Sequence, residues 1–139
     1  MRAHDDIVRA ALSAFGGREV KHTGDGIMAS FASAASAIKC ATRIQSDLAK
    51  KQNEGEGEAL KVRIGAAAGE PVDHQNDLFG RTVQFAARLC VHPMAEQIVV
   101  SNVVAELCIG KGITFEELGE IALKGFDQPV RAHAVPWTL

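Results

Sequence analysis

Apolar residues recur along this chain at two periods, and the changes of period predict alternating helices and strands. The first run has a 3.6-residue period, which is typical of an amphipathic helix with one buried face. Its apolar positions are Ile7, Val8, Ala11, Leu12 and Phe15. Asp5 and Asp6 suit the positive end of this helix, and Gly16 and Gly17 predict its end.

A hairpin and a second helix are predicted next. Two short apolar-bearing runs between residues 18 and 31 flank Gly24, Asp25 and Gly26, and glycine accommodates the positive φ that a tight turn requires. The following helix is predicted from Ser33 to Lys50, with a stripe of apolar residues that faces the core. This stripe consists of Ala34, Ala37, Ile38, Ala41, Ile44 and Leu48. The polar residues 52–58 predict a solvent-exposed loop.

The rest of the chain alternates further between strands and helices. Residues 60–64 alternate as a strand and run into the small residues 65–69, whose glycines favour a strand that its neighbours approach closely. The later predicted elements are a loop at 70–79, a helix at 80–91, a buried strand at 97–100, a short helix capped by Ser101 and ending near Cys108, and strands at 115–118, 121–123 and 130–135. Without an internal repeat or a long linker, this order predicts a single α/β domain over residues 1–139, an α+β sandwich.

Composition and charge exclude several classes of protein. The 139 residues are 47% hydrophobic and 23% charged, and the net charge of −2 comes without the basic block that nucleic-acid binding would favour. No apolar run approaches the roughly 18 residues of a membrane span, and the acids near the N-terminus are not typical of a secretory signal. Cys40, Cys90 and Cys108 are odd in number and widely spaced, so we expect reduced core thiols in a cytoplasmic protein.

Two segments carry candidate chemistry. The predicted turn presents the carboxylate of Asp25 at its tip, free to meet a cation, although a plain turn residue would look the same. Gln84 and Arg88 are four residues apart, so they project from one face of the predicted third helix, and Asp77 lies on the approach to it. Taken alone, the pair on this helix is more typical of a solvated face than of a binding site.

Read together, the segments resemble the class III nucleotidyl cyclase catalytic domain through nearly the whole chain. GGREVKHTGDGIMASF is similar to the family's hairpin, LKVRIGAAAGEPV to its central strand, and DLFGRTVQFAARL to its dimer-interface helix. QIVVS and FEELGEIALKGFDQPVRAHAV are similar to its closing strand, Lys-Gly turn and last strand. The resemblance implies a ferredoxin-like cyclase fold, with helices packed on a central, mostly antiparallel sheet.

The resemblance also implies a chemistry. In this family the 3′-hydroxyl of a nucleoside triphosphate attacks its own α-phosphate and pyrophosphate leaves, with two Mg²⁺ or Mn²⁺ ions held by two aspartates. Asp25 matches the second of these aspartates. Arg88 matches the arginine that stabilises charge on the reacting phosphate, a role that suits its planar fork of donors.

The remaining matches concern substrate recognition. Lys21 matches the lysine that donates to adenine N1, and Asp77 matches the aspartate that accepts from the adenine amino group. This combination implies ATP in preference to GTP, because guanine presents the opposite pattern of donors and acceptors. Lys124, in the Lys-Gly turn, is our candidate for a late lysine that contacts the phosphates.

The chain departs from the family pattern in two places. Gln84 stands where the family usually has an asparagine that orients the ribose, so its amide is displaced by one methylene. The family's first strand, which carries the first metal-binding aspartate, has no counterpart before the first predicted helix. Asp5 and Asp6 stand at a helix start, so the metal role is not carried over to them. We therefore expect a sheet without its first strand and a metal site with one of its two aspartates absent.

The sequence thus predicts an N-terminally incomplete adenylate cyclase domain that forms cyclic AMP from ATP at the interface of a head-to-tail homodimer in intracellular signalling. As a family member it would be an enzyme, a phosphorus–oxygen lyase, and the missing strand leaves open whether this chain is active alone. The alternative is a non-catalytic cyclase-homology module for nucleotide binding, dimerisation or regulation. The missing strand and Gln84 favour the module, whereas the retained Lys21, Asp25, Asp77 and Arg88 favour the enzyme.

Overall fold

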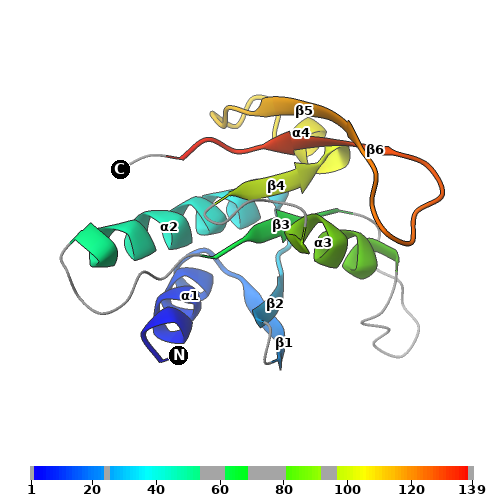
Figure 1. Ribbon diagram of the computed structural model, residues 1–139. Helices are drawn as coiled ribbons and strands as arrows, with labels where there is room; N and C mark the ends of the chain where they lie inside the picture. Colours follow the sequence, from blue (N-terminus) through cyan, green and yellow to red (C-terminus); the bar gives the residue numbers. More distant parts are fainter. Residues whose placement is uncertain (1, 24–25, 54–61, 69–80, 92–96, 138–139) are drawn as a thin grey trace. The chain divides into compact units, whose positions relative to one another are not determined.

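The computed structural model describes residues 2–23, 26–53, 62–68, 81–91 and 97–137 (Figure 1). The chain divides into two compact units, residues 1–61 with 137–139 and residues 62–136. The prediction of one domain over residues 1–139 stays a prediction. None of the helices in the described ranges combines the length and the apolar character that crossing a lipid bilayer requires.

The first unit consists of two helices separated by a hairpin, in the predicted order. Its elements are α1 (Arg2–Ala14), β1 (Arg18–Thr23), β2 (Gly26–Ser30) and α2 (Ala34–Asn53). The two helices contact each other, and most of the residues predicted to face the core are buried, whereas Ile7, Phe15, Ala34 and Ala37 are half-buried. Val8, Ala11 and Leu12 of α1 are buried, as are Ile38, Ala41, Ile44 and Leu48 of α2. The 3.6-residue period of both segments is thereby confirmed.

The two glycines after α1 end the helix as predicted. Gly16 adopts a φ of 73°, and the Gly17 amide donates to the Leu12 carbonyl at 2.8 Å, which satisfies a carbonyl of the last turn. A Cβ atom on Gly17 would lie 2.6 Å from the ring of Phe31, so the residue that follows the hairpin packs directly over this helix end. Both glycines are therefore required, the first for its backbone conformation and the second for space.

The hairpin is confirmed, and its register defines its tip. β1 and β2 are antiparallel, and Thr23 pairs with Gly26, so Gly24 and Asp25 are the two residues between the last paired positions. These two residues lie outside the described ranges. After the hairpin, the Ser33 hydroxyl accepts from the Ser36 amide at 3.2 Å and caps α2, which continues beyond the predicted end to Asn53.

The second unit is a four-stranded sheet with two helices. Its elements are β3 (Ile64–Ala66), α3 (Arg81–Val91), β4 (Ile98–Ser101), α4 (Asn102–Leu107), β5 (Glu116–Ile121) and β6 (Val130–Ala134). The strand order is β3-β4-β6-β5, with β3 parallel to β4 and the other two pairs antiparallel. The Ser101 hydroxyl accepts from the Val104 amide at 3.3 Å, which confirms Ser101 as the cap of α4.

The boundaries of two predicted strands differ from those observed. The strand predicted from residue 60 into residues 65–69 is observed as Ile64–Ala66 within the described range 62–68, because pairing with β4 begins at Ile64, whose amide donates to the Gln97 carbonyl. The strands predicted at 115–118 and 121–123 are one strand, β5, since Gly119 adopts a φ of 79° at a register shift and the chain passes through it without leaving the sheet.

The two faces of this sheet carry different helices. On the α3 side a cluster of buried side chains forms the core, and Phe85, Phe126 and other half-buried apolar residues pack against it. The buried members of this cluster are Leu89, Val99, Leu123 and Ala132. Successive side chains of a strand point to opposite faces, so the residue after Ala132 in β6 points to the other face, where α4 contacts β6.

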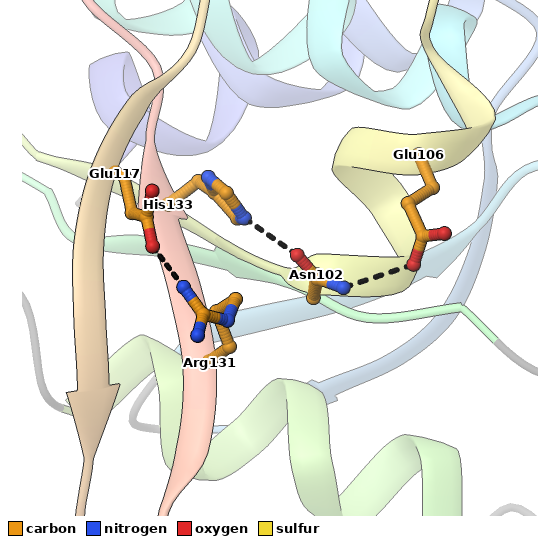
Figure 2. A network of polar contacts seen from close by, with 5 residues as sticks. All are labelled: Asn102, Glu106, Glu117, Arg131 and His133. Carbon is orange, nitrogen blue, oxygen red and sulfur yellow. Dashed lines mark hydrogen bonds and ion pairs between the residues drawn. The ribbon is translucent and has the colours of Figure 1, made fainter.

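That other face carries a polar network (Figure 2). The Asn102 amide nitrogen donates to Glu106 Oε1 at 2.9 Å, so the amide oxygen accepts from His133 Nε2 at 2.8 Å. Alongside it, Arg131 of β6 forms an ion pair with Glu117 of β5. These contacts join α4 to β6 and β6 to β5, and they stabilise the second unit around its last strand.

All three cysteines are free thiols, as predicted. Cys40 and Cys108 are buried, and Cys90 is half-buried with its sulfur donating to the Arg63 carbonyl at 3.3 Å. Burial raises the pKa of Cys40 to about 11 and raises the pKa of Cys90 and of Cys108 above its ordinary value. The thiols therefore remain protonated near neutral pH and serve as small apolar groups.

Candidate active site

The helix α3 holds the first candidate side chain, Arg88. Leu89, the next residue, is fully buried in the core of the second unit, and Phe85 packs against the same core one turn earlier. Arg88 itself is exposed. The anchoring of its neighbours therefore fixes the helix, and Arg88 extends from it on the outer side.

A tight turn after β5 holds the second candidate, Lys124. The Phe126 amide donates to the Leu123 carbonyl at 3.1 Å, and Gly125 adopts a φ of 86°, as the third residue of such a turn requires. Leu123 is buried in the core, whereas Lys124 is exposed. The Lys-Gly sequence therefore forms a tight turn that exposes Lys124 directly after the buried Leu123.

Arg88 and Lys124 line one pocket. It has a volume of about 250 Å³, and the other lining residues are Ala87, Gly125 and Phe126. The rings of Phe126 and of Phe85 contact each other with centroids 5.2 Å apart, so the aromatic wall is attached to the same helix as Arg88. Two segments far apart in the sequence thus form one small concave site.

The described lining of this pocket is positively charged. Within the described ranges, no carboxylate is among the lining residues, and neither Arg88 nor Lys124 has an ion-pair partner. Two cationic side chains that line one pocket provide a site for an anion, and the guanidinium suits the oxygens of a phosphate group. The pocket can therefore bind a phosphate group and neutralise its charge.

The other predicted site residues are placed only in part. Lys21 lies in β1 and pairs with Met28 across the hairpin, and Gln84 lies in α3, one turn before Arg88. Asp25 and Asp77 lie outside the described residues. The structure therefore brings Arg88 and Lys124 together, and the roles of all six residues stay predictions.

Phe126 was not among the predicted site residues. Its place directly after the Lys-Gly turn is the signal that could have identified it, because a half-buried aromatic residue there packs the turn against the core. In the part of the chain that the structure describes, no group of three or more histidines, cysteines or acids is arranged to hold a metal ion.

Comparison with known proteins decides the family. The family model described as "Adenylate and Guanylate cyclase catalytic domain" matches residues 2–136. The chain belongs to this cyclase family. The resemblance that the sequence motifs indicated is thereby confirmed, and the family is one of enzymes.

Solved structures support the cyclase fold. An adenylate/guanylate cyclase/hydrolase from Silicibacter pomeroyi is 33% identical with a TM-score of 0.77, over 96% of this chain and 80% of that one. The adenylyl cyclase CyaB from P. aeruginosa has a TM-score of 0.82 at 22% identity, over 99% of this chain and 81% of that one, and at this identity it bears on the fold alone. The predicted α/β cyclase fold class is confirmed.

Curated relatives of the cyclase domain are much longer than this chain. The protein named "Adenylate cyclase" from Mycosarcoma maydis is 30% identical over 141 residues, which cover 84% of this chain and 6% of that protein. A relative from Rhizobium meliloti (strain 1021) is 29% identical over 135 residues, 96% of this chain and 23% of its own length. The chain spans less than a third of the curated relatives that it matches.

Proposed function

We propose that this cyclase domain converts ATP into cyclic AMP and pyrophosphate. The observation that carries the proposal is the pocket lined by Arg88 and Lys124, whose described lining residues include no carboxylate, since it suits the phosphates of a nucleotide. In the reaction, the 3′-hydroxyl loses its proton to solvent as its oxygen forms a bond to the α-phosphorus, and the bond from that phosphorus to the leaving pyrophosphate breaks. Membership of the cyclase family supports this chemistry over other uses of an anion site.

Arg88 and Lys124 have separable roles in this proposal. Negative charge spreads over the phosphate oxygens as the reaction proceeds, and a guanidinium held beside them stabilises the transition state more than the bound substrate. Lys124, as a point charge on a tight turn, neutralises the phosphates of the bound triphosphate. Gln84, one turn before Arg88 on the same helix, would donate its amide to the ribose.

A divalent cation is part of the proposal through Asp25. The carboxylate of Asp25 is a ligand that Mg²⁺ and Mn²⁺ prefer, and the substrate phosphates supply further oxygens. When bound, the ion supplies Lewis-acid polarisation of the phosphate oxygens. The family's other aspartate has no counterpart in this sequence, so Asp25 is the only carboxylate to which we assign this role.

The proposed working form is a homodimer with the two copies head to tail. Each site would take Asp25 from one copy and Arg88, with the base-reading residues, from the other. The resemblance of the α3 segment to the family's dimer-interface helix supports this arrangement. A cytoplasmic location, where ATP is abundant, agrees with the proposal.

The proposal is tested by measuring cyclic AMP and pyrophosphate from Mn²⁺-ATP. We expect both products in equal amounts from residues 1–139 or from the longest reading frame that encodes them. Absence of cyclic AMP from both proteins, at micromolar enzyme and with either ATP or GTP, would contradict the catalytic proposal. Retention of nucleotide binding in that case would support the non-catalytic module instead.

Base selection provides a second test. Exchanging Lys21→Glu together with Asp77→Cys should lower the preference for ATP over GTP by about 100-fold, because glutamate accepts from guanine N1–H where lysine donates to adenine N1. The measurement is kcat/KM for both nucleotides. The matched control is Lys39→Glu with Asp47→Cys on α2, which makes the same chemical changes at described positions outside the proposed site. An unchanged preference in the first variant would refute the assigned roles.

A further inference from the structure

The strand β3 and the helix α3 meet backbone to backbone at Gly65. A Cβ atom on Gly65 would lie 2.3 Å from Cys90 N, 2.7 Å from Cys90 Cα and 2.7 Å from the Leu89 carbonyl carbon. All three distances are below 3.0 Å, so a larger residue and the helix cannot both keep these positions. Because the atoms belong to the helix backbone, no change of side-chain rotamer relieves the contact. Gly65 is thus required for space, since its φ is not positive.

Helix α3 contacts β3 at Leu89 and Cys90, the two residues directly after Arg88. Gly65 pairs with Val99 of β4, and Val99 and Leu89 are fully buried in one cluster, so the strand is fixed by its neighbour in the sheet. The Cys90 sulfur donates to the Arg63 carbonyl at 3.3 Å and adds a polar contact between helix and strand. A larger residue at position 65 therefore displaces α3, and Arg88 moves with the helix.

We propose that Gly65 is a positioning residue for Arg88, because its missing side chain lets α3 lie close enough to β3 to hold the guanidinium beside Lys124. The inference rests on the proposed function of Arg88. An ordinary van der Waals contact begins at 3.4 Å, so a methyl group at residue 65 displaces the helix by about 1 Å. A displacement of this size is enough to lower a rate by about 100-fold when it misplaces a catalytic group.

The first measurement is the kinetics of Gly65→Ala at a temperature where the variant is folded. We expect kcat to fall about 100-fold while KM for ATP rises less than about tenfold, because Arg88 acts mainly on charge that develops in the transition state. The matched control is Val100→Ala, which removes buried volume from the same sheet at a residue that points to its opposite face. It should lower the melting temperature and leave kcat within about threefold.

The second measurement separates positioning from general damage to the fold. In an Arg88→Ala background, Gly65→Ala should lower kcat by less than about threefold further, because the group that it misplaces is already absent. Equal losses in both backgrounds would overturn the inference, as would a Gly65→Ala enzyme with wild-type kcat.

A milder variant keeps the inference testable if Gly65→Ala does not fold. Ala67 lies two residues later, on the same face of the chain, and packs against the core cluster that contains Leu89. Ala67→Val adds volume under the same helix against a side chain that can adjust, so we expect about a tenfold loss of kcat, again absent in the Arg88→Ala background. An Ala67→Val enzyme with unchanged kcat would contradict the inference.

A binding measurement distinguishes failure of the inference from failure of the proposed function. If the wild-type protein forms no cyclic AMP, pyrophosphate binding by calorimetry replaces turnover, with the same variants. Gly65→Ala and Arg88→Ala should each weaken binding about tenfold, and the double variant no more than Arg88→Ala alone. Equal affinity of wild type and Gly65→Ala, or no binding by the wild type, would overturn the inference.

Discussion

Replacement of Arg88 by alanine should lower kcat for cyclic AMP formation by about 1,000-fold, with a much smaller change in KM. The guanidinium lies with Lys124 in a pocket whose described lining residues include no carboxylate, so its charge is available to the substrate. Loss of one preorganised donor to a developing charge lowers kcat by about 100- to 1,000-fold, and an arginine that stabilises a phosphoryl transition state contributes at least as much. The measurement is steady-state kinetics with Mn²⁺-ATP.

Arg131→Ala is the matched control for this variant. Arg131 is also an exposed arginine of the second unit, but it forms an ion pair with Glu117 across β5 and β6. An exposed pair of this kind contributes less than about 1 kcal/mol to stability, so the control should keep both fold and kcat. Arg88→Lys should recover part of the lost rate, since it restores the charge without the fork of donors. Equal effects of Arg88→Ala and Arg131→Ala would exclude a catalytic role for Arg88.

Replacement of Asp25 by asparagine should lower the metal-dependent kcat at least about 1,000-fold. Asparagine keeps the size of the side chain and the turn preference, but it removes the negative charge that holds a divalent cation. A bound cation supplies several kcal/mol of transition-state stabilisation in phosphoryl chemistry, and each 1.4 kcal/mol is a tenfold change in rate. The measurement is kcat as a function of Mn²⁺ concentration, with circular dichroism to verify the fold.

The control for Asp25 is an aspartate with a structural role only. Asp47 lies on α2 and accepts from Arg43 at 3.1 Å, one helical turn away. Asp47→Asn should therefore leave the Mn²⁺ dependence unchanged. If Asp25→Asn retains the wild-type Mn²⁺ dependence, Asp25 is a turn residue and the metal lies elsewhere.

Local patterns were sufficient to predict the helices and the hairpin. The apolar period of α1 and α2, the glycines that follow α1 and the Ser101 cap all act within one or two turns of chain, where sequence and structure are directly coupled. The boundaries of β3 and β5 were missed because pairing partners decide them. The sequence predicted a strand from residue 60 into residues 65–69, yet pairing with β4 starts only at Ile64, and the bulge at Gly119 resembles a break until β6 is beside it.

The residues of the candidate site were likewise predicted only in part. Arg88 and Lys124 were predicted from a resemblance of separate segments, and the structure brings them into one pocket. Phe126 and Gly65 were not predicted as parts of the site, since their importance arises from what packs on them. Phe126 contacts Phe85 across the core, and Gly65 meets the backbone of α3. Such contacts join residues far apart in the chain. The glycines within residues 65–69 predicted a close approach, but not that α3 is the segment that makes it.

The outer strand β5 has a consequence for the behaviour of this protein at high concentration. Among the strands that the structure describes, β5 forms one edge of the four-stranded sheet, and its Glu116, Glu117 and Glu120 are exposed on either side of the bulge at Gly119. An unpaired strand edge is a template on which a second chain can add and start an aggregate. Glu117 forms an ion pair with Arg131, whereas the carboxylates of Glu116 and Glu120 repel a second copy of the same strand, and a bulge interrupts the straight register that such growth needs. The acidic side chains and the bulge of β5 therefore disfavour fibril formation through this edge.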